Sequence, residues 1–148
     1  MLNDVFGPER LILNLEGTTK SDVFEELIEI IAVSNSGFNR QELLEAVVLR
    51  ESKMNTIILP GIAVPHGYCP SVNGIVGAMG FSREGIEYDT LDRDPVHLFF
   101  MLLMDDSSWE EHLQVLSRLL ELLNSRALSK IRGVKERPQE IYKLLCRF

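Results

Sequence analysis

The feature that most constrains the fold of this chain is the nine-residue run from Val96 to Met104, in which only His97 is polar. A strand with one solvated face alternates apolar and polar residues, so a run that is apolar on both alternating faces indicates a strand covered on both sides. The run is far shorter than the ~20 residues that a membrane-spanning helix needs. Helical patterns precede and follow it. We therefore expect an α/β fold, a mixed sheet of about five strands with helices packed on both faces.

Two helices are predicted ahead of this strand. The first follows threonine and serine caps within residues 18–21 and ends before the polar turn at 34–37. The second begins at Asn39, because Glu42 lies three residues further on, at the spacing of a capping box. Apolar residues at helical spacing predict its buried face: Leu43, Leu44, Val47 and Val48.

Short extended segments are predicted around these helices. Pro65 biases Val64 away from helical backbone, and residues 82–85 have the composition of a turn. The remaining strands are expected at 11–15, 56–59, 62–65, 74–81 and 86–89.

The last third of the chain is predicted to be helical. Ser107 and Glu110 have capping-box spacing at the start of a long helix. A short helical turn over 127–131 and a closing helix from Pro138 through Leu145 follow. One face of the long helix is expected to carry Trp109, His112, Leu113, Leu116, Leu119, Leu120 and Leu123.

Composition sets the broad class of protein. The 148 residues, 45% hydrophobic and 25% charged, predict one domain over 1–148 with a core that needs no metal or disulfide. The net charge of −7 argues against a nucleic acid partner. The sequence has neither an export signal nor a stretch long enough for membrane insertion. Two cysteines, Cys69 and Cys146, fit a reduced, cytoplasmic protein.

His66 is the strongest candidate for chemistry among the three histidines. It follows an extended segment, Pro65 fixes the backbone before it, and Gly67 permits close approach of a ligand or partner. Neutral imidazole is a nucleophile toward phosphorus, and its pKa near 6.5 keeps a neutral population at physiological pH. A turn histidine without a chemical task is the alternative. His97, inside the central strand, is expected to be a structural residue with a satisfied hydrogen bond.

Two further residues suit an anionic group. His112 lies near the start of the long helix, where the dipole is positive, and we expect it to be neutral in the resting protein. Arg50 ends the second helix, and its guanidinium matches phosphate oxygens. Each has a structural alternative, His112 as a core-edge residue and Arg50 as a cation that complements the helix dipole.

These residues also carry a resemblance. The chain is similar to the enzyme IIA domains of the mannitol/fructose/nitrogen-regulatory class, which belong to the phosphoenolpyruvate-dependent phosphotransferase system. The similarity covers nearly the whole chain, and its most specific element is the proline-histidine pair at 65–66. The matching segments are Leu49-Arg50-Glu51, Thr56, Gly61-Ile62-Ala63-Val64-Pro65-His66-Gly67, Gly85-Ile86-Glu87-Tyr88, Asp92, Pro95-Val96 and His112-Leu113.

The resemblance implies a mixed sheet flanked by helices and a phosphoryl acceptor at His66, reacting through Nε2. It implies that the phosphoryl group comes from the phosphocarrier protein HPr and, in sugar systems, passes to an enzyme IIB domain. By the same analogy Arg50 and His112 surround the phosphoryl group, and Thr56, Pro65 and Gly67 support the site. No cofactor or metal is implied.

Two interpretations of the resemblance remain, and one independent of it. We favour a regulatory protein of the nitrogen-related branch, because the chain carries no appended domain and the segment 85–96 is most similar to those members. A free-standing sugar-specific enzyme IIA of the fructose/mannitol type is the alternative. The third is a metal or Cys-His hydrolase site made by His66, Cys69 and His112.

Two carboxylates, Asp105 and Asp106, precede the helix of His112. They would either repel a phosphoryl group that approaches the site or remain solvated at the helix start.

Overall fold

The computed structural model describes residues 2–88, 94–124 and 138–147. Its helices are α1 (Leu2–Val5), the 3₁₀ helix η1 (Pro8–Arg10), α2 (Lys20–Val33), α3 (Arg40–Lys53), α4 (Trp109–Leu123) and α6 (Pro138–Leu145). Its strands are β1 (Leu11–Ile12), β2 (Ile57–Leu59), β3 (Ile62–Ala63), β4 (His66–Tyr68), β5 (Ile75–Ile86) and β6 (Val96–Met104).

The six strands form one mixed sheet in the order β1-β5-β6-β3-β2, and β4 also pairs with β6. Strand β6 runs antiparallel to β5 and parallel to β3 and β4. All nine of its residues are buried. The predictions of a mixed α/β sheet and of a central strand covered on both faces are therefore confirmed.

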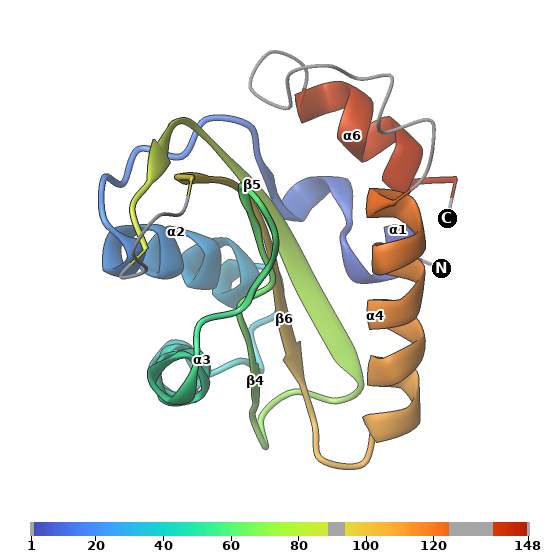
Figure 1. Ribbon diagram of the computed structural model, residues 1–148. Coiled ribbons are helices and arrows are strands. Elements are labelled where there is room, and N and C mark those ends of the chain that lie inside the picture. Colours follow the sequence, from blue (N-terminus) through green and yellow to red (C-terminus); the bar gives the residue numbers. More distant parts are fainter. Residues whose placement is uncertain (1, 89–93, 125–137, 148) are drawn as a thin grey trace.

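Alternate side chains of β6 point into two separate cores. Phe100 and Leu102 pack with α1, α4 and α6, whereas Phe99 and Met101 pack with α2 and α3. Figure 1 shows these two groups of helices on opposite faces of the sheet. This division follows from the two-residue period of a strand, because neighbouring side chains leave the backbone in opposite directions.

The predicted starts of the first two helices are confirmed. The Thr19 hydroxyl accepts a hydrogen bond from the Asp22 amide at 3.1 Å, and the Asn39 side chain accepts one from the Glu42 amide, also at 3.1 Å. Each cap satisfies a backbone donor that has no partner inside its helix. On α3, however, Val48 is half exposed and not part of the buried face.

The strands differ from the expected ones in several places. Strand β4 was not expected, and Ile86 ends β5 instead of beginning a separate strand. The first strand contains only Leu11 and Ile12, and the segment 82–85 is not a turn but the last part of β5, which continues to Ile86. Pairing is irregular between Phe81 and Ile86. Gly85 adopts a positive φ of 87° there, so the strand bends without ending.

The beginning of α4 also differs from the expectation. The helix starts at Trp109, and neither Ser107 nor Ser108 caps it, since both hydroxyls donate to Asp105. Three residues expected on the inward face are exposed instead: Trp109 at 54%, Leu113 at 48% and Leu120 at 41%. The closing helix from Pro138 through Leu145 is confirmed, and the helical turn expected at 127–131 lies outside the described residues. Within the residues described, none of the helices has the length and apolar character needed to cross a membrane.

Candidate functional site

His66 lies at the start of β4, not at the end of the strand that precedes it. Strand β3 ends at Ala63, and β4 then pairs His66 with Leu102 of the central strand. Helix α3 packs closely on β4, because a Cβ at Gly67 would stand only 2.6 Å from the carbonyl carbon of Ala46. The absence of a side chain at Gly67 therefore permits the close approach of α3, which carries Arg50 in its last turn.

The His66 ring is oriented by the backbone just before it. Its Nδ1–H donates to the Val64 carbonyl at 2.9 Å, and the buried Pro65 restricts the chain between them. A proton on Nδ1 leaves the lone pair of the neutral ring on Nε2. In the half-buried His66, Nε2 is therefore the ring nitrogen with a free lone pair.

Burial and charge favour the neutral form of His66. Burial lowers the pKa of His66 below its usual value, and the positive charge of Arg50 lowers it further, whereas the hydrogen bond to Val64 and the negative charge of Glu51 raise it. The net shift is downward. At neutral pH the neutral, nucleophilic ring therefore predominates.

His112 lies beside His66. Its ring, 4% exposed, has its centroid 5.7 Å from that of His66 and packs between Tyr68 and Trp109 at centroid distances of 6.2 and 5.7 Å. Burial and the neighbouring His66 lower the pKa of His112. Its buried Nδ1 has no hydrogen-bond partner among the described residues.

Arg50 is the cation of this group. Its Nη1 donates to the Met54 carbonyl at 2.9 Å, across the turn that ends α3, and its charge acts on both His66 and Tyr68. The guanidinium has donors beyond the one that this bond uses. Two residues from separate elements thus act on His66, Arg50 through its charge and His112 through its neighbouring ring.

Thr56 is bound to Glu51, the residue that follows Arg50 in α3. It is buried, its hydroxyl donates to Glu51 Oε2 at 2.8 Å, and its amide donates to Glu51 Oε1 at 3.2 Å. The sequence resemblance includes Glu51 in the Leu49-Arg50-Glu51 motif but implies no role for it. A signal was present, since Glu51 continues the helical row of Leu43 and Val47, where an apolar residue is expected.

Asp105, in the loop before α4, has a structural role. Asp105 accepts hydrogen bonds from the Gly74 amide at 2.7 Å and from the hydroxyls of Ser108 and Ser107 at 2.7 and 2.8 Å. These donors, the Gly74 amide first, lower the pKa of Asp105 to about 2. Its carboxylate therefore holds the loop that leads into the helix of His112.

The other candidates lie apart from this group. His97 is buried and its Nδ1–H donates to the Ser82 carbonyl at 2.8 Å, as expected of a structural histidine. Cys69 is also buried, with its sulfur 3.2 Å from the Ser71 hydroxyl. Within 2–88, 94–124 and 138–147, no three histidine, cysteine or carboxylate side chains are arranged to hold a metal ion.

Four exposed apolar side chains belong to residues that are next to Arg50 in α3 and its following turn or that contact the His112 ring. Leu49 and Met54 flank Arg50 on α3 and its following turn, and Tyr68 and Trp109 flank His112. Their exposed fractions lie between 39% and 67%. We call these four side chains the apolar collar. Such a rim around polar groups is typical of a surface that binds another protein.

Comparisons with known proteins agree with this geometry. Residues 4–147 match the family model described as "Phosphoenolpyruvate-dependent sugar phosphotransferase system, EIIA 2". The fructose-specific EIIABC component of Bacillus subtilis is 36% identical over 129 residues, which are 87% of this chain and 20% of that protein. A nitrogen regulatory protein of Bradyrhizobium diazoefficiens is 28% identical over 98% of this chain and 94% of its own length.

Solved structures give the same result. The crystal structure of the nitrogen regulatory protein IIA-Ntr from Neisseria meningitidis superposes with a TM-score of 0.83 at 27% identity, covering 97% of this chain and 98% of that one. The fold is also that of enzyme IIA mannitol of Escherichia coli in its complex with phosphorylated enzyme IIB, with a TM-score of 0.76 and coverage of 97% and 98% at 21% identity. On the family match over nearly its whole length, this chain belongs to the EIIA type 2 family of the phosphoenolpyruvate-dependent phosphotransferase system.

Proposed function

We propose that this chain is a phosphocarrier whose His66 accepts a phosphoryl group on Nε2 from an HPr-like protein. The observation that carries the proposal is the Nδ1–H hydrogen bond of His66 to the Val64 carbonyl, because it leaves the Nε2 lone pair free to attack. The lowered pKa of His66 keeps that lone pair available at neutral pH. No cofactor is needed, since the donor supplies the phosphoryl group.

The transfer is a single displacement at phosphorus. The Nε2 lone pair forms the new N–P bond while the bond from phosphorus to the donor breaks, and the donor leaves with that electron pair. Arg50 supplies a positive charge beside the phosphoryl oxygens, and His112 supplies one N–H donor. Positioning and charge stabilisation account for most of the catalysis of such a step.

The surroundings of His66 favour a protein donor. The apolar collar offers exposed apolar area around a small polar centre, the usual composition of a protein–protein surface. A net charge of −7 disfavours a nucleic acid. The HPr-like donor and the acceptor, an enzyme IIB or a regulated protein, would use this surface in turn.

Among the family's roles we favour the nitrogen-regulatory one, in which the phosphorylation state of His66 selects the partner. The similarity to nitrogen regulatory proteins extends over nearly the full length of those proteins, with a TM-score of 0.83 for the Neisseria structure. Sugar uptake of the fructose type is the second candidate, because the 36% identity to the Bacillus fructose component is higher than the 28% to the Bradyrhizobium protein.

The test is reconstitution with phosphoenolpyruvate, enzyme I and HPr, followed by measurement of acid-labile phosphate and by mapping of the modified residue. We expect one phosphate per chain, on His66, and none when HPr is omitted. Phosphate on another residue, or none at all, would overturn the proposal. Addition of fructose- and mannitol-type enzyme IIB proteins then separates the two roles, because rapid loss of phosphate to an enzyme IIB would favour sugar uptake.

A further inference from the structure

A carboxylate occupies a core position of helix α3. Glu51 continues the row of Leu43 and Val47 and is only 7% exposed. A buried charge is costly unless other groups compensate it. An apolar side chain would pack more easily at this position. Packing alone therefore does not explain why a carboxylate is found there.

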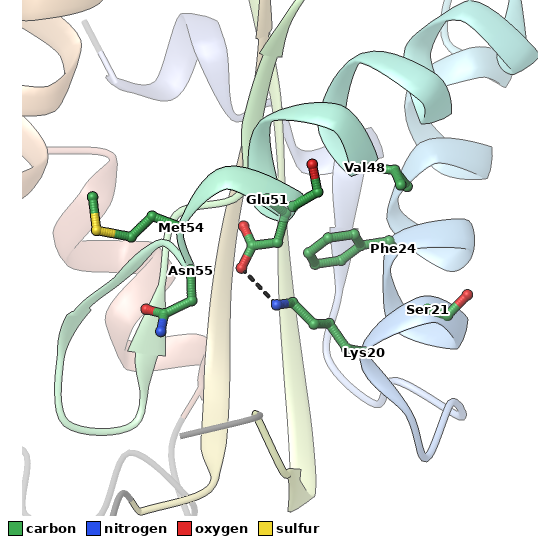
Figure 2. A pocket seen from close by; sticks show the side chains of 8 residues that line it. Lys20, Ser21, Phe24, Val48, Glu51, Met54 and Asn55 are labelled. Carbon is green, nitrogen blue, oxygen red and sulfur yellow. Dashed lines mark ion pairs between the residues drawn. The ribbon is translucent and has the colours of Figure 1, made fainter. Parts of the chain in front are cut away.

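Three groups hold the Glu51 carboxylate in place. Lys20 Nζ, from the start of α2, lies 2.9 Å from Oε1, and the amide and hydroxyl of Thr56 donate to the same carboxylate. Figure 2 shows Lys20 and Glu51 reaching toward each other beside Phe24 and Asn55. Lys20 also lies over the ring of Tyr88, 4.2 Å from its centroid. The carboxylate thus joins α2, α3 and the segment before β2.

A continuous series of hydrogen bonds leads from Glu51 to the reacting ring. Thr56 donates to Glu51 through its amide and hydroxyl, and its own carbonyl accepts from the Val64 amide at 2.9 Å. The Val64 carbonyl in turn accepts from Nδ1 of His66 at 2.9 Å. Each step fixes the position of the next residue, so a displacement of Glu51 would reach the group that orients His66.

Glu51 also bears on the neighbouring arginine. Adjacent residues of an α-helix point about 100° apart. Because Glu51 is held inward, the rotation of the last turn of α3 is fixed, and with it the direction in which Arg50 leaves the helix. The bond from Arg50 Nη1 to the Met54 carbonyl spans the same turn.

We propose that Glu51 is a positioning residue, which sets His66 through Thr56 and Val64 and sets Arg50 through the last turn of α3. This inference rests on the proposed function and goes beyond it, since Glu51 itself touches no phosphoryl group. Lys20 is the counterion that makes the buried carboxylate tolerable. A purely structural ion pair would stabilise the fold without affecting the rate of phosphoryl transfer per folded molecule.

The first experiment compares Glu51→Gln with Glu45→Gln in the full chain. Both changes remove one carboxylate charge from α3, but Glu45 is exposed. At saturating phospho-HPr we expect Glu51→Gln to lower the phosphorylation rate constant by ~10–100-fold, the cost of misplacing reacting groups by a fraction of an ångström to about 1 Å. The phospho-HPr concentration at half-saturation stays unchanged, because Glu51 is not on the docking surface.

The second experiment uses Thr56, which links Glu51 to Val64. Thr56→Val keeps the side-chain shape but removes the hydroxyl, whereas Thr56→Ser keeps the hydroxyl. We expect Thr56→Ser to react faster than Thr56→Val, and the latter to resemble Glu51→Gln. This pair keeps the inference testable if Glu51→Gln does not fold, and equal rates in the two threonine variants would contradict it.

A titration of His66 by NMR needs no phosphoryl donor. The negative charge of Glu51 raises the pKa of His66, so the pKa should fall in Glu51→Gln and remain that of the wild type in Glu45→Gln. A wild-type rate constant together with an unchanged titration, whatever the loss in Tm, would overturn the positioning role. If the wild-type protein itself accepts no phosphate, the proposed function fails, and the titration still reports whether Glu51 acts on His66.

Discussion

Two histidines of this protein make nearly the same hydrogen bond in different surroundings. Nδ1–H of His66 donates to the Val64 carbonyl at 2.9 Å, and that of His97 donates to the Ser82 carbonyl at 2.8 Å. His97 is buried in the central strand, whereas His66 is half-buried and feels the charge of Arg50. The bond to a carbonyl therefore selects a tautomer in both, and access and a nearby cation distinguish His66, the proposed phosphoryl acceptor, from His97.

Replacing His66 or His97 by glutamine should give the largest difference in phosphorylation between the two regions. His66→Gln should abolish acid-labile phosphorylation and leave the fold intact, because a half-exposed residue contributes little packing energy. His97→Gln should still accept phosphate. It should lose about 1–3 kcal/mol of unfolding free energy if the Ser82 carbonyl loses its donor. Phosphate on the His66→Gln variant, or none on a folded His97→Gln variant, would contradict the prediction that His66 and not His97 is the residue required for phosphorylation.

The charge beside His66 is the second difference between the two regions. Arg50→Lys should not restore the wild-type rate, because an ammonium cannot reproduce the forked geometry of a guanidinium. We expect a loss of about 1.5–3 kcal/mol in transition-state stabilisation, measured as kcat/KM for phospho-HPr. Arg40→Lys, on the first turn of α3 and paired with Glu29, is the matched control. An Arg50→Lys variant with wild-type kinetics would leave Arg50 as a helix-end cation.

The ring of His112 is the third difference between the two regions, because it lies beside His66 and not beside His97. A phosphoryl group on His66 adds negative charge beside His112, so the pKa of His112 should rise on phosphorylation. The measurement is an NMR titration of all imidazoles in both states. His112→Ala should accept phosphate slowly and pass it on more slowly still. Normal transfer together with an unchanged pKa would make His112 a core-edge residue.

The smallest effect concerns the loop that leads to His112. Asp105 has a pKa lowered to about 2, below the usual ~3.9 of an unfolded chain, so its contribution to stability is present above pH ~4 and is lost as the pH falls toward 2. Asp105→Asn should remove this part of the acid dependence, as measured by urea unfolding between pH 5 and 2. The neighbouring Asp106→Asn should keep it. If the unfolding free energies of Asp105→Asn and of the wild type change with pH in the same way, the hydrogen bonds that Asp105 accepts do not stabilise the protein.

Local and periodic features made most of the fold predictable. The run at 96–104 indicated a strand covered on both faces, and the caps at Thr19 and Asn39 indicated helix starts, because each depends on neighbouring residues only. The bend in β5 was not predictable, since Ser82 and Gly85 have turn composition and only the pairing with β6 keeps them in the strand. Tertiary pairing outweighs local preference there.

The candidate site was predictable in its members but not in its connections. His66 and His112 were chosen by their types and places, and the structure brings their rings together. The partners of Thr56 could not be read from the sequence, because its bonds to Glu51 depend on the turn after α3. Nothing local indicated that Asp105 would accept from Gly74, which is far from it along the chain.

The parallel pairing of β4 with the central strand has a consequence for the order of folding. Strands β5 and β6 are close in sequence and pair antiparallel over most of their length, whereas β4 must find β6 across the whole of β5. Contacts between distant segments require a larger loop to close and form more slowly. We therefore expect the β5–β6 pair to form early and His66 to reach its final position late, so that substitutions in β4 would mainly accelerate unfolding.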